Sequence, residues 1–111
     1  MGNIGHTNVI FQNAVTTTGT GTEFNVNGAE EMNIQFIMTS GTFTAQIKAL
    51  GVDQSTWYAY PSFKLPTYEL MSSTITDKSF LYNVDLRCIS KIRVELTALS
   101  GTITVLGKAV S

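Results

Sequence analysis

A chain of 111 residues is long enough for one domain with a modest core, and it leaves no room for a second domain. The formal net charge is -1, from 7 basic and 8 acidic residues, so the sequence offers no basic surface for nucleic acid. Only 14% of the residues are charged, against about 25% in an average soluble domain. Because subunit interfaces are depleted in Lys, Glu and Asp, this low charge favours a subunit of an oligomer.

The N-terminal quarter of the chain predicts short strands and turns. Residues 1–7 are glycine-rich and predict a mobile segment ahead of a single domain spanning residues 8–111. A strand is expected at Asn8–Val15, followed by a Thr/Gly loop, TTTGTGT. Glu23–Gly28 predicts a second short strand that ends at Asn27-Gly28, a dipeptide typical of tight turns.

Two nearly identical stretches follow, SGTFT at Ser40–Thr44 and SGTIT at Ser100–Thr104. Apolar residues alternate with other residues on both sides of each stretch. They are Met32, Ile34, Phe36 and Met38, then Phe43, Ala45, Ile47 and Ala49, around the first, and Ile92, Val94, Leu96 and Ala98, then Ile103, Val105 and Ala109, around the second. A period of two predicts half-buried strands, and Ser-Gly supplies turn chemistry. The sequence therefore predicts two β-hairpins of one design, with coincidence in a Thr/Gly-rich chain as the alternative.

The middle of the chain is less regular. STWYAY predicts a strand, but Pro61 and Pro66 exclude a central strand in the segment after it, which is expected to be a connection or an edge. Alternation resumes at Ser79–Leu86, and a turn at Arg87–Ser90 leads into the last pair of strands. About eight strands and no helix predict an all-β protein, a single antiparallel β-sandwich that is jelly-roll-like or C2-like.

Residues suited to catalysis or metal binding are scarce. The one histidine, His6, lies in the predicted mobile segment. Glu30 and Glu31 are adjacent and are expected to point to opposite faces as solvated turn residues. Asp53 and Asp77 stand apart, whereas a calcium loop needs clustered carboxylates. We therefore predict that the protein is not an enzyme and has no catalytic residue, no cofactor and no metal.

One aromatic cluster is the only binding-type signal. It comprises Trp57, Tyr58, Tyr60 and Phe63, with a proline among them. Aromatic rings beside a proline can form a platform for a sugar or the centre of a protein interface. The alternative is a core position for Trp57, with the tyrosines packed on a neighbouring strand or subunit.

The order of these motifs resembles that of small phage and prophage β-sandwich proteins. The resemblance rests on TTTGTGTEFNV, MNIQFIMTSGTFTAQI, TWYAY, FLYNVDL and the closing ISKIRVELTALSGTITVLGKAV, and it covers the chain from Val15 to Val110. It implies a part of a tail, baseplate or head, or a lysis-cassette protein, built from sandwiches that assemble as ring-like homo-oligomers. It supplies no catalytic residue.

Three functions follow as hypotheses. The first is a non-enzymatic structural subunit of a phage particle that forms a ring-like homo-oligomer and contacts other phage structural proteins. The second is a lysis-cassette or membrane-surface module that uses Lys64, Lys78, Arg87, Lys91 and Phe63. The third is a carbohydrate-binding module that uses Trp57, Tyr58 and Tyr60. Nucleic acid is not an expected partner.

Localisation follows from what the sequence lacks. The start, MGNIGHTNVIF, has neither the basic region nor the long apolar region of a secretory signal, and no stretch approaches the about 18 apolar residues of a membrane span. The single cysteine, Cys88, forms no intrachain disulfide and is expected to be a small hydrophobic residue near a strand. We expect the protein in the host cytoplasm until assembly or lysis releases it, with the virion as the alternative location.

Overall fold

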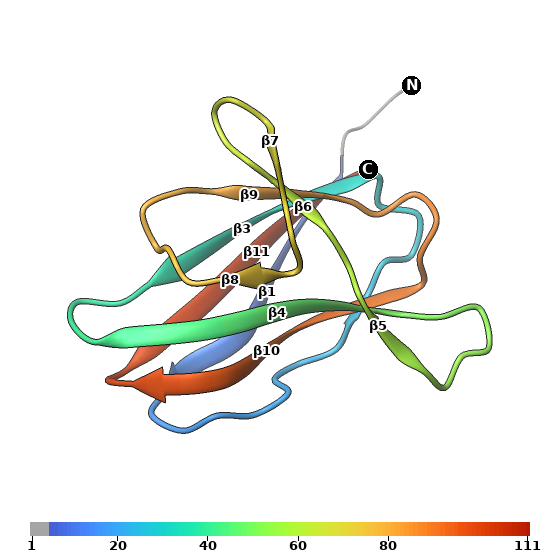
Figure 1. Cartoon of the computed structure of the whole chain (residues 1–111). Coiled ribbons are helices and arrows are strands. Elements are labelled where there is room, and N and C mark those ends of the chain that lie inside the picture. Colours follow the sequence, from blue (N-terminus) through green and yellow to red (C-terminus); the bar gives the residue numbers. More distant parts are fainter. Residues whose placement is uncertain (1–4) are drawn as a thin grey trace.

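Two antiparallel β-sheets pack face to face in the computed structural model, which describes residues 5–111 (Figure 1). These residues form eleven strands and no helix. The predicted all-β class and antiparallel sandwich are confirmed. The strands outnumber the predicted eight because five of them are only two or three residues long.

The larger sheet, sheet A, has six strands. In spatial order they are β1 (His6–Val15), β11 (Ile103–Val110), β3 (Glu31–Ile37), β9 (Tyr82–Asp85), β6 (Ser62–Lys64) and β7 (Glu69–Met71). The first strand begins two residues earlier than expected, because His6 and Thr7 pair with Val110 and Ala109. Residues 1–4 of the predicted mobile segment lie outside the described residues.

The smaller sheet, sheet B, has five strands. In spatial order they are β2 (Phe24–Asn25), β10 (Lys91–Ser100), β4 (Thr42–Leu50) and β5 (Trp57–Ala59), and β8 (Thr74–Ile75) also pairs with β4. The predicted turn after β2 is present, since Asn27 and Gly28 have φ angles of 46° and 81°. Such positive angles are typical of the tight turns that this dipeptide favours.

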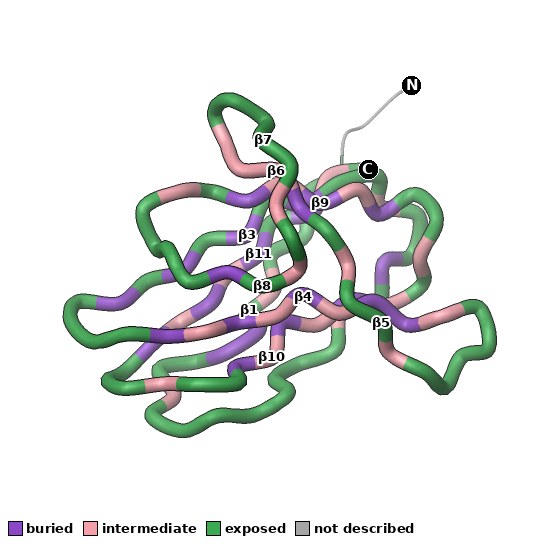
Figure 2. Tube along the Cα trace, in the orientation of Figure 1, coloured by how far each residue is buried: buried purple, intermediate pink, exposed green. Residues whose placement is uncertain are grey.

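The core lies between the sheets and follows the predicted alternation. Every second residue of β3, β4, β11 and the first part of β10 is buried, as the purple segments of Figure 2 show. Phe36 of sheet A stacks on Phe43 of sheet B with ring centroids 5.0 Å apart, and Tyr82 meets Phe36 edge-on at 5.7 Å. These three aromatic side chains join the two sheets, and all three are buried.

The two SGT stretches are turns, as predicted, but the predicted hairpins are wrong. Each turn carries the chain from one sheet to the other, so β3 pairs with β11 and β4 pairs with β10. The two turns lie against each other: a Cβ on Gly41 would stand 1.9 Å from the carbonyl oxygen of Ser100, and one on Gly101 would stand 2.7 Å from that of Ser40. A hairpin and a sheet-to-sheet corner have the same alternation, so only long-range pairing distinguishes them. The repeated stretches are therefore two equivalent corners packed together at one end of the sandwich.

Strand β10 departs from the predicted alternation near its end. The pairing with β4 shifts between Leu96 and Ala98, which is a β-bulge. The extra residue leaves Ala98 exposed and lets Leu99 pack against the core instead. The prediction that Ala98 faces inward is therefore wrong.

The segment between the two prolines contains a strand with neighbours on both sides. Strand β6 pairs with β7 and with β9, although the sequence predicted an edge or a connection. Pro61 precedes the strand and Pro66 follows it, so neither proline removes a hydrogen-bond donor from the ladder. The prolines themselves lie outside any strand, as predicted. The prediction that no central strand occurs between them is wrong, because β6 is one.

Candidate functional site

The four aromatic residues predicted as a site are divided between the two sheets. Trp57 and Tyr58 belong to β5 of sheet B, Phe63 belongs to β6 of sheet A, and the chain crosses between the sheets after Tyr60. The hydroxyl of Tyr60 donates a hydrogen bond to the backbone carbonyl of Asp85 at 2.6 Å. Burial, together with the negative charge of Asp85, raises the pKa of Tyr60 above its ordinary value. The four side chains thus do not form one platform.

On the outer face of sheet B, charged side chains form ion pairs with one another. The guanidinium of Arg93 lies 4.1 Å from the ring centroid of Trp57, a cation–π distance. Its Nη2 atom is 2.7 Å from a carboxylate oxygen of Glu95, and its Nη1 atom is 3.8 Å from Glu23. Lys91 also lies 3.6 Å from Glu23. Trp57 is therefore a half-buried partner of Arg93 on the outer face, and not a core residue.

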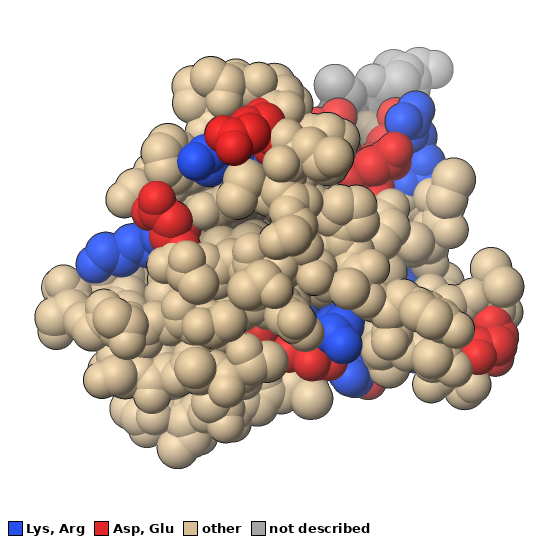
Figure 3. All heavy atoms as spheres, in the orientation of Figure 1, with Lys and Arg blue, Asp and Glu red and all other residues tan. Residues whose placement is uncertain are grey.

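One half of the outer face of sheet A, formed by β1, β11 and β3, exposes large apolar side chains. Ile10 is 50% exposed and Ile37 is 45% exposed, and Leu81, at the start of the β9 segment, is 42% exposed. A groove of about 690 Å³ runs over this half, and Leu106 and Val110 are among its apolar lining residues. Its polar lining residues are His6, Asn8, Asn33, Gln35 and Lys108. Few charged residues interrupt the surface of the molecule, as Figure 3 shows for one face. We call this half the apolar face.

The other half of the same face holds a polar pocket of about 350 Å³. Its lining residues come from β3 and the segment before it, from β9 and β6, and from the segments that follow β9 and β6. They are Glu30, Glu31, Phe63, Tyr68, Asn83, Asp85 and Arg87. Of the predicted site residues, only Phe63 lines this pocket. We call it the polar pocket.

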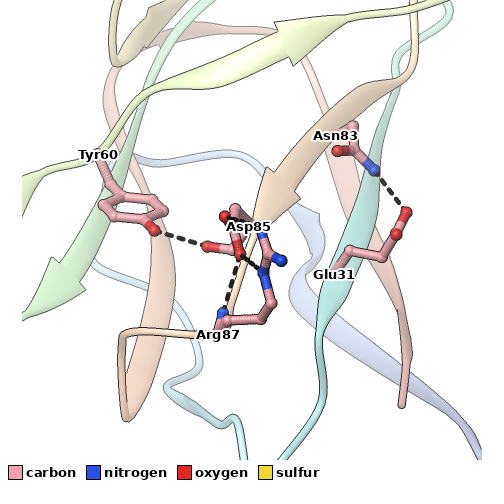
Figure 4. Close-up of polar contacts among 5 residues, drawn as sticks. All are labelled: Glu31, Tyr60, Asn83, Asp85 and Arg87. Carbon is pink, nitrogen blue, oxygen red and sulfur yellow. Dashed lines mark hydrogen bonds and ion pairs between the residues drawn. The ribbon is translucent and has the colours of Figure 1, made fainter.

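Hydrogen bonds hold the polar side chains of the pocket in place (Figure 4). Arg87 donates from Nε and Nη2 to the two carboxylate oxygens of Asp85 at 3.0 Å and 2.9 Å, and its backbone N–H donates to the same carboxylate at 3.0 Å. The side-chain amide of Asn83 donates to Glu31 at 3.1 Å and to Asn33 at 2.9 Å. The pocket therefore presents fixed polar groups rather than free side chains.

The expectation that Glu30 and Glu31 point to opposite faces is wrong, because both line the polar pocket. Strand β3 begins at Glu31, so Glu30 lies outside the strand and the alternation rule does not apply to it. The available signal was the run of polar residues at every second position of both strands, Asn33 in β3 and Asn83 and Asp85 in β9. The pairing of these two strands, which brings the residues together, is not visible in the sequence.

The pairing of Arg87 with Asp85 predicts a measurable change in titration. Hydrogen bonds from the Arg87 side chain, then from its backbone, lower the pKa of Asp85 from 3.8 to about 2. A lowered pKa stabilises the folded state above the unfolded pKa, and this contribution is lost as the pH falls through the folded pKa. Arg87→Gln should raise the pKa of Asp85 part of the way to 3.8 and should weaken the loss of stability between about pH 4 and pH 2.

Carboxylate NMR measures this pKa directly, and Asp53 is an internal control. The pKa of Asp53 is lowered to about 2 by hydrogen bonds from Thr56 and Ser55 and should not respond to Arg87→Gln. An unchanged Asp85 pKa in the variant would contradict the assigned cause.

The aspartates considered for calcium are used within their own turns. Asp53 accepts hydrogen bonds from Ser55 and Thr56, and Asp77 accepts one from the backbone of Ser79 at 2.8 Å. Residues 5–111 contain no group of three or more His, Cys, Asp or Glu side chains placed to hold a metal ion. In the same residues no helix is long and apolar enough to cross a bilayer. Cys88 is exposed in a turn and is not packed as the small hydrophobic residue that was expected.

A comparison with protein-family models assigns the chain. The XepA family model matches residues 5–109, which is nearly the whole chain. The chain belongs to the XepA family. The expected resemblance to small phage and prophage β-sandwich proteins is confirmed.

Two solved structures share the XepA-family fold with this chain. The prophage SPBc2-derived protein YomS superposes with a TM-score of 0.91 at 21% identity, over 100% of this chain and 97% of YomS. The PBSX exported protein XepA superposes with a TM-score of 0.92 at 18% identity, over 100% of this chain. This chain spans 39% of the length of that XepA. No curated protein sequence matches the chain.

Proposed function

We propose that this XepA-family protein is a non-enzymatic structural component of a phage particle, in the tail, baseplate or head, and that it assembles as a ring-like homo-oligomer. The observation that carries the proposal is the apolar face. Alternating strands with one buried face normally place polar residues on the other, yet Ile10, Ile37 and Leu81 stand there in water. Burying them against a neighbouring copy gains hydrophobic free energy that the monomer forgoes.

The contrast between the two outer faces supports this choice of interface. On sheet B, ion pairs join Arg93 to Glu95 and to Glu23. A charged surface of this kind is stable in contact with water. On sheet A, the β1 half offers apolar side chains and the low charge that is typical of subunit interfaces. The apolar face is therefore the surface that gains most from a partner.

A ring needs the apolar face of one copy to meet a different surface of the next copy. The loop between β4 and β5 projects beyond the sandwich (Figure 1) and carries Val52, which is 97% exposed. Asp53 fixes this loop, because its carboxylate accepts hydrogen bonds from Ser55 and Thr56. A rigid loop with an apolar tip complements a groove lined by Leu106 and Val110, and a contact of this kind closes into a ring when its rotation allows.

The membrane-surface alternative receives less support. The cations that it needs are engaged within the molecule: Lys64 lies 3.6 Å from Glu69, Lys91 lies 3.6 Å from Glu23, and Arg87 lies 2.9 Å from Asp85. Lys78 donates to the backbone carbonyl of Met38. Binding to anionic lipid would compete with these contacts.

Light scattering coupled to size exclusion tests the assembly. The unmodified protein should elute as a discrete oligomer at micromolar concentration, and Ile10→Glu, Leu81→Glu and Val52→Glu should each shift it toward monomer because a buried unpaired charge is costly. Leu70→Glu is the matched control, since Leu70 is exposed on β7 of the same sheet, outside the apolar face.

Three results would each contradict a part of the proposal. If the unmodified protein is a monomer, the proposed oligomer does not form. If Leu70→Glu and Leu81→Glu have equal effects on the oligomer, the apolar face is not its interface. Absence of the protein from purified particles would remove the role in the particle while leaving the assembly intact.

A further inference from the structure

The polar pocket lies on the half of sheet A that the proposed subunit contact leaves free. Its residues come from β3, β9, β6 and their flanking segments, whereas the apolar face lies over β1, β11 and β3. Its volume of about 350 Å³ falls at the lower end of the about 300–1,000 Å³ typical of small-ligand sites. The pocket is therefore a second surface with chemistry of its own.

The pocket contains an arrangement that folding alone does not favour. Glu31 and Asp85 are directly paired across β3 and β9, and like charges in this position destabilise a sheet. Glu30 adds a third carboxylate to the same pocket. Arg87 neutralises part of this charge by pairing with Asp85, so three carboxylates face one guanidinium. Such a concentration of acceptors suits a ligand rich in hydrogen-bond donors.

The polar groups retain hydrogen-bonding capacity after their internal contacts are made. In the described part of the chain, Arg87 uses Nε and Nη2, which leaves the two N–H bonds of Nη1 for a ligand. Asn83 donates from its amide nitrogen and keeps its carbonyl oxygen as an acceptor. Fixed donors and acceptors side by side match hydroxyl groups, each of which both donates and accepts.

Two aromatic rings complete the pocket. Tyr68 is 60% exposed, and Phe63 also lines the pocket. Tyr68 has a φ of 57° and so lies in the left-handed region of backbone conformation. Residues other than Gly, Asn and Asp seldom adopt this region. An exposed ring beside polar groups offers an apolar surface for the C–H face of a pyranose and polar contacts for its hydroxyls.

We propose that the polar pocket binds a saccharide that is neutral or carries an amino group, stacked on Tyr68 and hydrogen-bonded by Asn83, Asp85 and Arg87. The excess of carboxylates over guanidinium repels anionic sugars. This site is distinct from the sugar platform expected at Trp57, Tyr58 and Tyr60, where Trp57 packs on Arg93 and the hydroxyl of Tyr60 is bonded to the backbone of Asp85.

Saturation-transfer difference NMR and titration calorimetry on the full chain test the proposal. The probes are chitotriose, maltotriose and glucosamine, with trigalacturonate as the anionic comparison. At least one of the first three should show saturation transfer to its ring C–H protons, and trigalacturonate should show none. Tyr68→Ala and Asp85→Asn should each weaken that binding about tenfold.

Tyr58→Ala is the matched control, because Tyr58 is 58% exposed, similar to Tyr68, but lies on β5 of sheet B. It should leave the affinity within about twofold. No binding of any of the three probes overturns the proposal, as does an equal loss in Tyr58→Ala and Tyr68→Ala. Binding of spermidine without binding of the sugars also overturns it and identifies the pocket as a site for cations. Light scattering on Tyr68→Ala tests whether the variant still assembles. The oligomer should be unchanged, so a loss of sugar binding is distinguishable from a loss of assembly.

Discussion

Gly41→Ala is expected to lower the free energy of unfolding by about 3 kcal/mol or more. The φ angle at Gly41 is 107°, where a Cβ costs about 1–2 kcal/mol. The new Cβ would also stand 1.9 Å from the carbonyl oxygen of Ser100, so one corner must move away from the other, and forced repacking costs about 1–3 kcal/mol more. Urea denaturation should show the loss in the midpoint, and thermal unfolding should show a Tm lower by roughly 10 °C.

Three other glycines provide a graded control. Gly101→Ala should cost less than Gly41→Ala, because its Cβ would stand 2.7 Å from the Ser40 oxygen. Gly28→Ala meets no atom within 4 Å but has a φ of 81°, so it should cost about 1 kcal/mol. Gly19→Ala meets no atom within 4 Å and should change stability by less than about 0.5 kcal/mol. If Gly41→Ala were no more costly than Gly28→Ala, the packing of the two corners against each other would be wrong.

Phe36→Ala is expected to lower the free energy of unfolding by about 3–5 kcal/mol. The side chain is buried, stacks on Phe43 of the opposite sheet and contacts Tyr82 edge-on, so its removal leaves a cavity across the interface of the two sheets. A domain of this size has a total stability of about 5–15 kcal/mol, and the loss therefore approaches unfolding. The shift of the urea midpoint measures this loss of stability. If the variant does not fold, far-UV circular dichroism shows the loss of strand structure.

Phe36→Leu and Tyr58→Ala are the controls for this cavity. Leucine refills most of the volume and should recover more than half of the loss. Tyr58 is an exposed aromatic residue, so its truncation should cost less than about 0.5 kcal/mol. A Phe43→Ala and Phe36→Ala double-mutant cycle should show a coupling of about 0.5–1.5 kcal/mol, and additive effects would contradict a direct stack between the sheets.

The two halves of the outer face of sheet A differ because the residues on the outward positions of its strands differ. Over β1 and β11 these positions include Ile10, Leu106 and Val110, beside Asn8 and Lys108, and the three apolar side chains suit a protein partner. Over β9 they hold Asn83 and Asp85, which suit a hydroxylated ligand. One sheet can thus serve assembly and binding side by side, and the two experiments above address them separately.

The sequence predicted the class of the fold because the signals for strands and turns are local. Alternation at Met32, Ile34 and Phe36 needs only neighbouring residues, and so does the turn at Asn27-Gly28. The bulge at Ala98 could not be predicted, because it depends on the partner strand β4. The short strand β6 was missed for a similar reason, since three residues between prolines carry no periodic signal of their own.

The candidate sites were less predictable than the fold. The sequence identified aromatic residues near the middle of the chain, and of these only Phe63 reaches the polar pocket. Tyr68, Asn83 and Asp85 carried no motif, because they come from segments that only the sheet brings together. The alternation of a strand does not apply to the pair Glu30 and Glu31, because β3 begins at Glu31 and Glu30 lies outside it.

By itself the sequence determined an all-β sandwich with low charge, the positions of its longer strands, and two SGT turns. The tertiary structure decided which strands pair, and so turned the expected hairpins into two corners that pack through Gly41 and Gly101. It also decided which side chains share a surface, placing Glu31 opposite Asp85 and Trp57 beside Arg93. The physical reason is that periodicity reports burial along one chain segment, whereas pairing and surface chemistry depend on contacts between segments far apart in the sequence.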